Sequence, residues 1–358
     1  MWPYWVLFFV FAFHAITKLR PAKLPLKSNR IPDKWRIVLV VLVLMIGLRH
    51  EVGGDWAQYL SHVEAAGEEG IKESLTRGDP AFSLLNWLGA HSGMGSYFIN
   101  TAFAVLFSWG LVSFCRNQPR PWLALVVAVP YLVTVVAMGY SRQGAAIGLV
   151  MFGLVALTNG NVLKFMFWVA LAATFHKSAV ILVPLALLTG TRRWFLTLVW
   201  VGLIFALLFM LFLQEAVEGL VTVYIGAEYD SSGAAIRVAM NAIPALIFLL
   251  RRKRFMLPHT QLVLWTWMAW GALAFVVLLY LSPSSTAVDR VALYWIPLQL
   301  FVWSRVPDAM GKSGGANAAW VFVVVGYSAV IYFVWLFFAT HAVYWLPYQF
   351  YPLVWLWR

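Results

Sequence analysis

A cluster of charged residues follows directly on one of the most apolar stretches of the chain. Residues 37–48 are apolar or small, and Arg49, Glu51 and Asp55 then occur within seven positions, next to two glycines. An arginine binds anionic groups through its planar donors, and a carboxylate can accept a proton from a reacting hydroxyl. These residue types therefore suit a site that binds an anion and moves a proton.

Three further apolar segments end or begin with residues of the same kind. Arg142 lies in a short link between two apolar segments, His176 follows another, and Arg290 begins a third. Segment 37–48 would cover only about 18 Å as a helix, so Arg49 is expected below the outer interface. Charges at membrane depth are costly and normally face a protein-lined, water-filled space. We therefore expect one recessed, outward-facing polar cavity; the alternative is that each arginine is an interfacial anchor.

The elements that must position these residues are apolar helices. The chain has 358 residues, of which 62% are hydrophobic and 11% charged, whereas soluble domains carry about 25% charged residues. The composition predicts an all-α, polytopic integral membrane protein, a single transmembrane domain over residues 1–358 with about 12 (11–14) transmembrane helices. The expected spans lie near 3–17, 35–48, 95–115, 121–138, 143–158, 162–176, 178–190, 194–213, 235–250, 260–281, 290–303 and 317–340.

The connections between these spans sort by charge. One set of connections holds 18 of the 26 Lys and Arg, and the other holds 12 of the 14 Asp and Glu. The positive-inside rule makes the basic set cytoplasmic, and it makes segments 49–80 and 214–234 extracytoplasmic. The basic residues are dispersed among apolar runs, so the net charge of +12 indicates topology and membrane-lipid partners rather than nucleic acid.

Six short motifs recur in an order that resembles the EpsG-like, Wzy-type polysaccharide polymerase family. They are R-x-x-x-G-G-D-W-x-x-Y from Arg49 to Tyr59, Asp79-Pro80, GYSRQGAA (139–146), FHKSA (175–179), DRVALY (289–294) and W-x-P-Y from Trp345 to Tyr348. The resemblance covers residues 45–348. The sequence departs from the family pattern at the two glycines before Asp55 and at Asp79, where glutamate is usual, which shortens the reach of that carboxylate.

The resemblance implies a glycosyltransferase of the bacterial inner membrane with its active site facing the periplasm. Donor and acceptor would both be oligosaccharide repeat units on undecaprenyl pyrophosphate, and a chain-length regulator protein would be a further partner. No nucleotide-binding loop and no metal-ligand spacing occur in the sequence, so we expect no cofactor and no metal. The single cysteine, Cys115, excludes an intrachain disulfide.

The resemblance also assigns roles to individual residues. Arg142 and Arg290 would bind the pyrophosphate, with Arg49 and His176 in support. The remaining expected substrate contacts are three tyrosines: Tyr59, Tyr140 and Tyr348.

Three carboxylates are candidates for the catalytic base. We rank Asp55 first, because two glycines allow the backbone to turn sharply beside it. Asp79 ranks second, because Pro80 restricts its backbone, and Glu51 ranks third. The alternative for Asp55 is that it only neutralises the charge of a buried arginine.

Three other functions remain open from the sequence. An O-antigen ligase uses the same donor, but its large outer loop usually falls later in the chain than 49–80. A membrane O-acyltransferase would need a His and Arg pair near the inner ends of early spans, and His14 has no such arginine motif. A flippase for lipid-linked oligosaccharides would spread ionisable residues through the depth of the membrane. Residues 341–358 are compatible with a span, a re-entrant segment or an interfacial helix.

Overall fold

Helices account for 83% of the residues in the computed structural model. The structure describes residues 1–22, 31–76, 78–188, 194–208, 210 and 233–356. Within these ranges there is no strand, and one isolated bridge joins Arg49 to Phe350. The all-α prediction is confirmed.

The twelve apolar stretches predicted as spans all fall in helical structure wherever the chain is described. The elements are α1 (Trp2–Thr17), α2 (Asp33–Gly47), α6 (Gly95–Arg116), α7 (Pro121–Ala128) with the π-helix η1 (Val129–Ala137), α8 (Ser141–Thr158), α9 (Val162–Phe175), the 3₁₀-helix η2 (Lys177–Leu188), α10 (Trp194–Leu208), α12 (Ala234–Arg251) with η4 (Arg252–Phe255), α13 (His259–Leu281), α14 (Ser285–Ala292) with η5 (Leu293–Trp295) and α15 (Ile296–Trp303), and α17 (Ala318–Phe338).

Among the described residues, five helices are long and apolar enough to cross a membrane: α6, α8, α12 with η4, α13 and α17. The chain is therefore a membrane protein by helix length and composition. The other apolar helices are shorter; α1, for example, has 16 residues and covers about 24 Å. A total of twelve crossings stays a prediction.

Helices α6 and α8 form the centre of the bundle and approach each other closely. A Cβ atom added to Gly110 of α6 would lie 1.9 Å from the carbonyl oxygen of Gly148 in α8. Small residues let apolar helices pack backbone against backbone, which is how helices associate without a hydrophobic driving force from water. This contact joins the second half of α6 to the middle of α8, the helix that carries Arg142 in its first turn.

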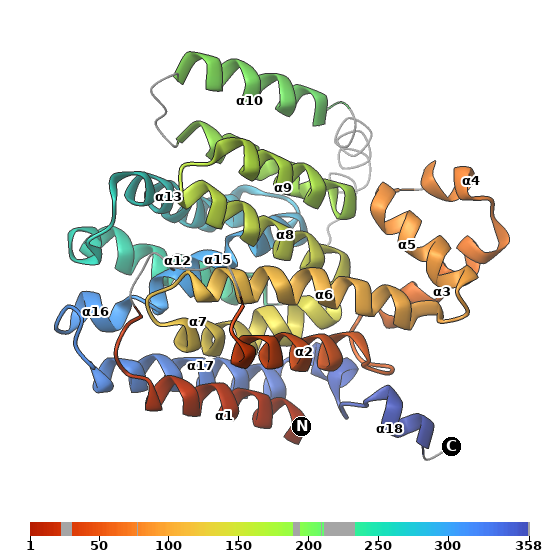
Figure 1. The fold of residues 1–358 in the computed structure, drawn as a ribbon, viewed down its shortest axis with the longest axis horizontal. Helices are drawn as coiled ribbons and strands as arrows, with labels where there is room; N and C mark the ends of the chain where they lie inside the picture. The colour runs from red at the N-terminus through yellow and green to blue at the C-terminus, as the bar shows by residue number, and fades with distance from the viewer. Residues whose placement is uncertain (23–30, 77, 189–193, 209, 211–232, 357–358) are drawn as a thin grey trace.

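The two ends of the bundle differ in the way that the charge distribution predicts. In Figure 1 the three helices of segment 49–91 lie beyond the right-hand end of the bundle, and α16 (Val306–Met310) lies at the other end. These three helices are α3 (Trp56–Glu68), α4 (Ile71–Thr76) and α5 (Pro80–His91). At the opposite end, one pocket is lined by Lys18, Lys34 and Arg116, and another by Arg254 and Arg305. The second predicted outer segment, 214–234, lies almost entirely outside the described residues.

The end of the chain is not one continuous helix. After α17 come the short helices η6 (Thr340–Trp345) and α18 (Tyr351–Leu356). The chain between them runs along the loop at 48–54: the amide of His50 donates to the carbonyl of Gln349, and that of Tyr351 donates to Leu48. Residues 340–356 therefore cover the first charged loop. One more short helix, α16 (Val306–Met310), precedes α17 and lies at the end of the bundle opposite α3, α4 and α5 (Figure 1).

Candidate active site

The loop between α2 and α3 carries the first group of predicted site residues, and Gly53 sets its path. Gly53 has a φ of +107°, and a Cβ atom there would lie 2.2 Å from the carbonyl oxygen of Met138. Its amide donates to the carbonyl of Tyr344. The glycine is therefore required because the loop packs backbone to backbone against the link before α8. This contact places Asp55 near Arg142.

Arg49 is fully buried and holds this loop to the bundle. Its guanidinium donates to the carbonyls of Val52 and Ile46, to Asn100 Oδ1 of α6 at 2.9 Å, and to Ser141 Oγ of α8 at 2.7 Å. Four of its five N–H groups are thus engaged within the protein. The predicted supporting role in pyrophosphate binding is untested, and this geometry favours a positioning role.

Asp55 lies at the centre of the predicted cationic residues. It is half-buried and begins α3, but its side chain does not cap that helix. Among the described residues its carboxylate accepts no hydrogen bond and forms no ion pair within 4.0 Å. Burial raises the pKa of Asp55, and the nearby charges of Arg290, Arg142, Arg49 and His176 oppose this shift. The structure therefore brings together the residues that the sequence placed at four separate helix ends.

The guanidinium groups of Arg142 and Arg290 each lie over an aromatic ring. Arg142 is 4.5 Å from the centre of the Phe82 ring, and Arg290 is 3.8 Å from that of Tyr140. Neither guanidinium has a carboxylate or hydrogen-bond partner among the described residues. A stacked guanidinium keeps its N–H edge open, so both can donate to an anionic ligand.

Asp79 and His176 lie beside each other at a second position in the site. Asp79 is 6% exposed; its Oδ2 lies 3.8 Å from Nδ1 of His176, and its Oδ1 accepts from the amide of Lys177. His176 Nδ1 is buried and has no hydrogen-bond partner among the described residues. Asp79 is thus engaged with the end of α9, whereas the carboxylate of Asp55 is not engaged.

The remaining predicted residues lie around this centre in different settings. Glu51 is exposed and lies 3.8 Å from Nε2 of His50. Tyr59 is buried, and its hydroxyl accepts from the amide of Arg142 at 3.1 Å. The ring of Tyr140 supports Arg290. Tyr348 donates to the carbonyl of Met45 at the end of α2. Tyr59 and Tyr348 thus position backbone rather than offer free hydroxyls.

Sequence reasoning missed an ion pair beside Arg290. Arg237 of α12 donates to both oxygens of Asp289, at 2.6 and 2.8 Å. The signal was present, because a carboxylate at the start of an apolar segment needs a cation nearby. The sequence could not identify Arg237 as this cation, because the two residues are 52 positions apart in the chain.

Sequence reasoning also missed Trp345, which packs against the link before α8. Trp345 is buried; its indole N–H donates to the carbonyl of Thr134 at 2.7 Å, and a Cβ atom on Gly139 would meet its ring at 2.2 Å. Trp345 belongs to the W-x-P-Y motif and was treated there only as part of the resemblance. In the described part of the chain, no three His, Cys, Asp or Glu side chains lie together in a way that could hold a metal ion.

Of the three comparisons with known proteins, the one with family models gave a match. Neither the curated proteins nor the solved structures yielded a match to this chain. The model of the EpsG family matches residues 34–350, which include every residue of the site described above. The chain therefore belongs to the EpsG family, the family of EpsG-like polysaccharide polymerases.

Proposed function

We propose that this protein is a glycosyltransferase of the bacterial inner membrane that polymerises oligosaccharide repeat units at the periplasmic face. It would transfer a glycan from undecaprenyl pyrophosphate onto a second lipid-linked repeat unit. One observation carries the proposal: in a chain of the EpsG family, two guanidinium groups without carboxylate partners among the described residues lie near an unengaged carboxylate.

Arg142 and Arg290 would bind the pyrophosphate of the donor. A diphosphate leaving group gains negative charge as its bond to the sugar breaks, and paired guanidinium groups stabilise that charge. Phe82 and Tyr140 support this role, because a ring beneath each guanidinium restricts its plane without consuming its donors. Because the rings already restrict the two arginine side chains, they lose less conformational entropy when the donor binds.

Asp55 would act as the catalytic base. The acceptor hydroxyl loses its proton to the Asp55 carboxylate, its oxygen bonds to the anomeric carbon, and the bond from that carbon to the pyrophosphate oxygen breaks. The products are the extended glycan, the protonated carboxyl group and undecaprenyl pyrophosphate. Asp55 is preferred to Asp79 because Asp79 is already paired with His176 and the amide of Lys177.

Two other groups would hold this centre in place. Asp79 would orient His176 toward the donor phosphates, in the manner of carboxylates that fix the ring of a working histidine. Arg49 would position the loop that carries Asp55, since its donors are engaged by Ile46, Val52, Asn100 and Ser141.

The test is a reaction with purified protein and a synthetic polyprenyl-pyrophosphate-linked oligosaccharide. Asp55→Asn should bind this donor with nearly normal affinity but form polymer about 10²–10⁴-fold more slowly. Glu64→Gln is the matched control, because Glu64 is an exposed carboxylate on the same helix, α3, and it should react normally. A folded Asp55→Asn protein with the wild-type rate would exclude the base role.

The same assay separates a polymerase from a ligase. A polymerase extends a second lipid-linked repeat unit and gives a ladder of products. A ligase would leave the repeat units unextended and transfer the glycan only when a lipopolysaccharide core is supplied. Transfer to the core alone would therefore replace the proposed function with ligation.

A further inference from the structure

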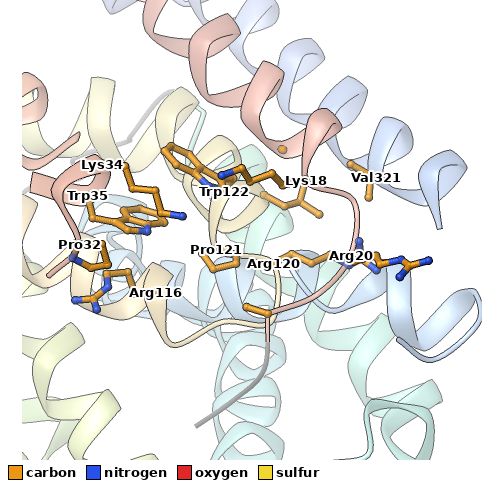
Figure 2. Close-up of a pocket in the computed structure, with 13 residues that line it drawn as sticks. Lys18, Arg20, Pro32, Lys34, Trp35, Arg116, Arg120, Pro121, Trp122 and Val321 are labelled. Atoms are coloured by element: carbon orange, nitrogen blue, oxygen red, sulfur yellow. The ribbon is translucent and has the colours of Figure 1, made fainter. Parts of the chain in front are cut away.

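A basic pocket lies at the end of the bundle opposite the candidate active site. It has a volume of about 250 Å³ and lies where α1 ends and α7 begins, beside the first turn of α2 (Figure 2). Helix α2 joins the two regions, because Lys34 lies in its first turn and Arg49 just after its last. Its 15 residues separate them by about 22 Å.

Of the described residues, five basic side chains line this pocket and no carboxylate does: Lys18, Arg20, Lys34, Arg116 and Arg120. Arg120 is already engaged, since it forms a two-pronged ion pair with Asp308 at 2.8 and 3.0 Å. Lys18, Arg20 and Lys34 have no acidic partner among the described residues. Figure 2 shows the ends of Lys18 and Lys34 on the same side of the pocket.

The two lysines are close enough to influence each other. Loss of solvent, together with the charge of Lys18 and a hydrogen bond to it, lowers the pKa of Lys34. Two ammonium groups held side by side repel unless an anion lies between them. These exposed cations at the pocket therefore favour a negative ligand.

The aromatic wall of the pocket limits the kind of anion. Trp35 and Trp122 stack at 4.6 Å, and His14 stacks on Trp122 at 4.4 Å. Both indoles are buried, with 4% and 7% exposed. No wide aromatic face is thus left for a nucleobase, and the wall is apolar beside the cationic rim.

The surface next to the pocket is suited to hydrocarbon chains. Phe13 lies just over one turn before Lys18 and is 63% exposed, and Ile37 lies about one turn after Lys34 and is 64% exposed. A ligand with a phosphate at the lysines can therefore lay apolar chains along α1 or α2. A free phosphate would leave this surface unused.

We infer that this pocket binds the phosphate headgroup of an anionic bilayer phospholipid, with Lys18, Arg20 and Lys34 as its principal cations. Basic pockets between membrane helices bind such headgroups, and each Lys or Arg near the surface strengthens the attraction. The lipid would connect α1, α2 and α7 at this end of the bundle. The inference does not rest on the proposed glycosyltransferase activity.

The test measures lipid binding to the purified protein in a neutral detergent, by native mass spectrometry and by thermal unfolding. Phosphatidylglycerol should bind and raise the unfolding temperature, whereas phosphatidylcholine should bind far more weakly. The double variant Lys18→Gln/Lys34→Gln should lose affinity by about fivefold for each lysine. Lys253→Gln is the matched control, because Lys253 is exposed at the same end but lies outside the pocket.

Two further arms distinguish the source of the phosphate. Inorganic phosphate that protects as well as phosphatidylglycerol would replace the lipid with a soluble anion, and tighter binding of a polyprenyl phosphate would replace it with the carrier lipid. The variant Lys18→Arg/Lys34→Arg keeps the charge and should keep the binding, which guards against a folding defect in the glutamine variant. Equal lipid binding by the wild type and the folded glutamine variant would overturn the inference.

Discussion

At the scale of single residues, the site contrasts engaged and unengaged charges. Arg49 donates to four internal acceptors, whereas the guanidinium groups of Arg142 and Arg290 touch only rings among the described residues. A buried arginine that donates most of its N–H groups to the protein holds a structure together. An arginine that keeps its N–H edge free can bind a ligand. The three arginines therefore predict different losses on substitution.

Arg142→Lys should lower activity without lowering the amount of folded protein. The lysine keeps the charge but loses the planar fork and the flat contact with Phe82. A hydrogen bond to a charged group contributes about 1.5–3 kcal/mol, so the rate at low donor concentration should fall about 10–100-fold. Arg252→Lys, in η4 at the basic end, is the control and should keep the wild-type rate. An unchanged rate for Arg142→Lys would leave Arg142 as an interfacial anchor.

The pH dependence of activity should report Asp55. Burial raises the pKa of its carboxyl group above the ordinary value of 3.8, and Arg290 is the strongest opposing charge. A base must be ionised, so activity should fall as the pH drops through this raised pKa. Arg290→Gln removes the opposing charge and should move the acid limb of kcat/KM to higher pH, whereas Arg290→Lys should leave it in place. If the acid limb of kcat/KM lay at the same pH in both variants, the group that titrates would not be Asp55.

At the scale of elements, the loop 48–55 depends on contacts with three distant parts of the chain. Arg49 binds α6 and α8, Gly53 packs against the link before α8, and His50 pairs with the segment after η6. The loop itself has no regular hydrogen bonding, so these contacts set its shape. A substitution that removes any one of these contacts should lower the stability of the folded protein.

Arg49→Ala should therefore destabilise the protein. It removes a buried side chain whose acceptors, among them Asn100 and Ser141, would be left without donors. Each buried polar group left without a partner costs about 1–3 kcal/mol. The yield of folded protein and its unfolding temperature in detergent should both fall, and Arg142→Ala should leave them nearly unchanged. A stable but inactive Arg49→Ala protein would instead support direct binding of pyrophosphate.

Two adjacent glycines provide a sharper test of the loop. Gly53→Ala forces a side chain into positive φ and against the carbonyl oxygen of Met138, which should cost at least about 1–3 kcal/mol. Gly54→Ala meets nothing closer than the Trp345 ring at 3.8 Å and should be tolerated. Equal unfolding temperatures for the two variants would contradict the packing described for Gly53.

At the scale of the whole molecule, the bundle has one basic end and one end that carries the candidate site. Lys18, Arg116 and Arg254 lie at the first end, and Asp55, Arg142 and Arg290 at the second. The positive-inside rule predicts that the first end faces the cytoplasm. The orientation decides which compartment supplies the substrate.

Cysteine labelling tests this orientation. Cys115 is buried, so it should contribute little background. Ser61→Cys on α3 should react with an impermeant maleimide in intact spheroplasts, because Ser61 is exposed beside the candidate site. Ser313→Cys is exposed at the basic end and should react only after lysis. The reverse labelling pattern would reverse the predicted membrane orientation and place the site on the cytoplasmic side.

The sequence by itself determined the class of the protein and the grouping of its charged residues. Apolar run lengths and the split of Lys and Arg between connections are properties of short stretches, so they can be read without a structure. They were enough to place Arg49, Arg142, His176 and Arg290 at one end, where the structure brings them near Asp55.

Only the tertiary structure decided which charges pair and which remain open. From the sequence, Asp55 ranks before Asp79 and Glu51 on backbone arguments alone. Among the described residues, Asp79 lies beside His176, Glu51 is exposed beside His50, and the carboxylate of Asp55 accepts no hydrogen bond. Arg237 was not considered, yet it neutralises Asp289. The physical reason is range: hydropathy acts over a whole helix, whereas an ion pair or hydrogen bond forms only within about 3–4 Å, and the packing of distant helices sets that distance.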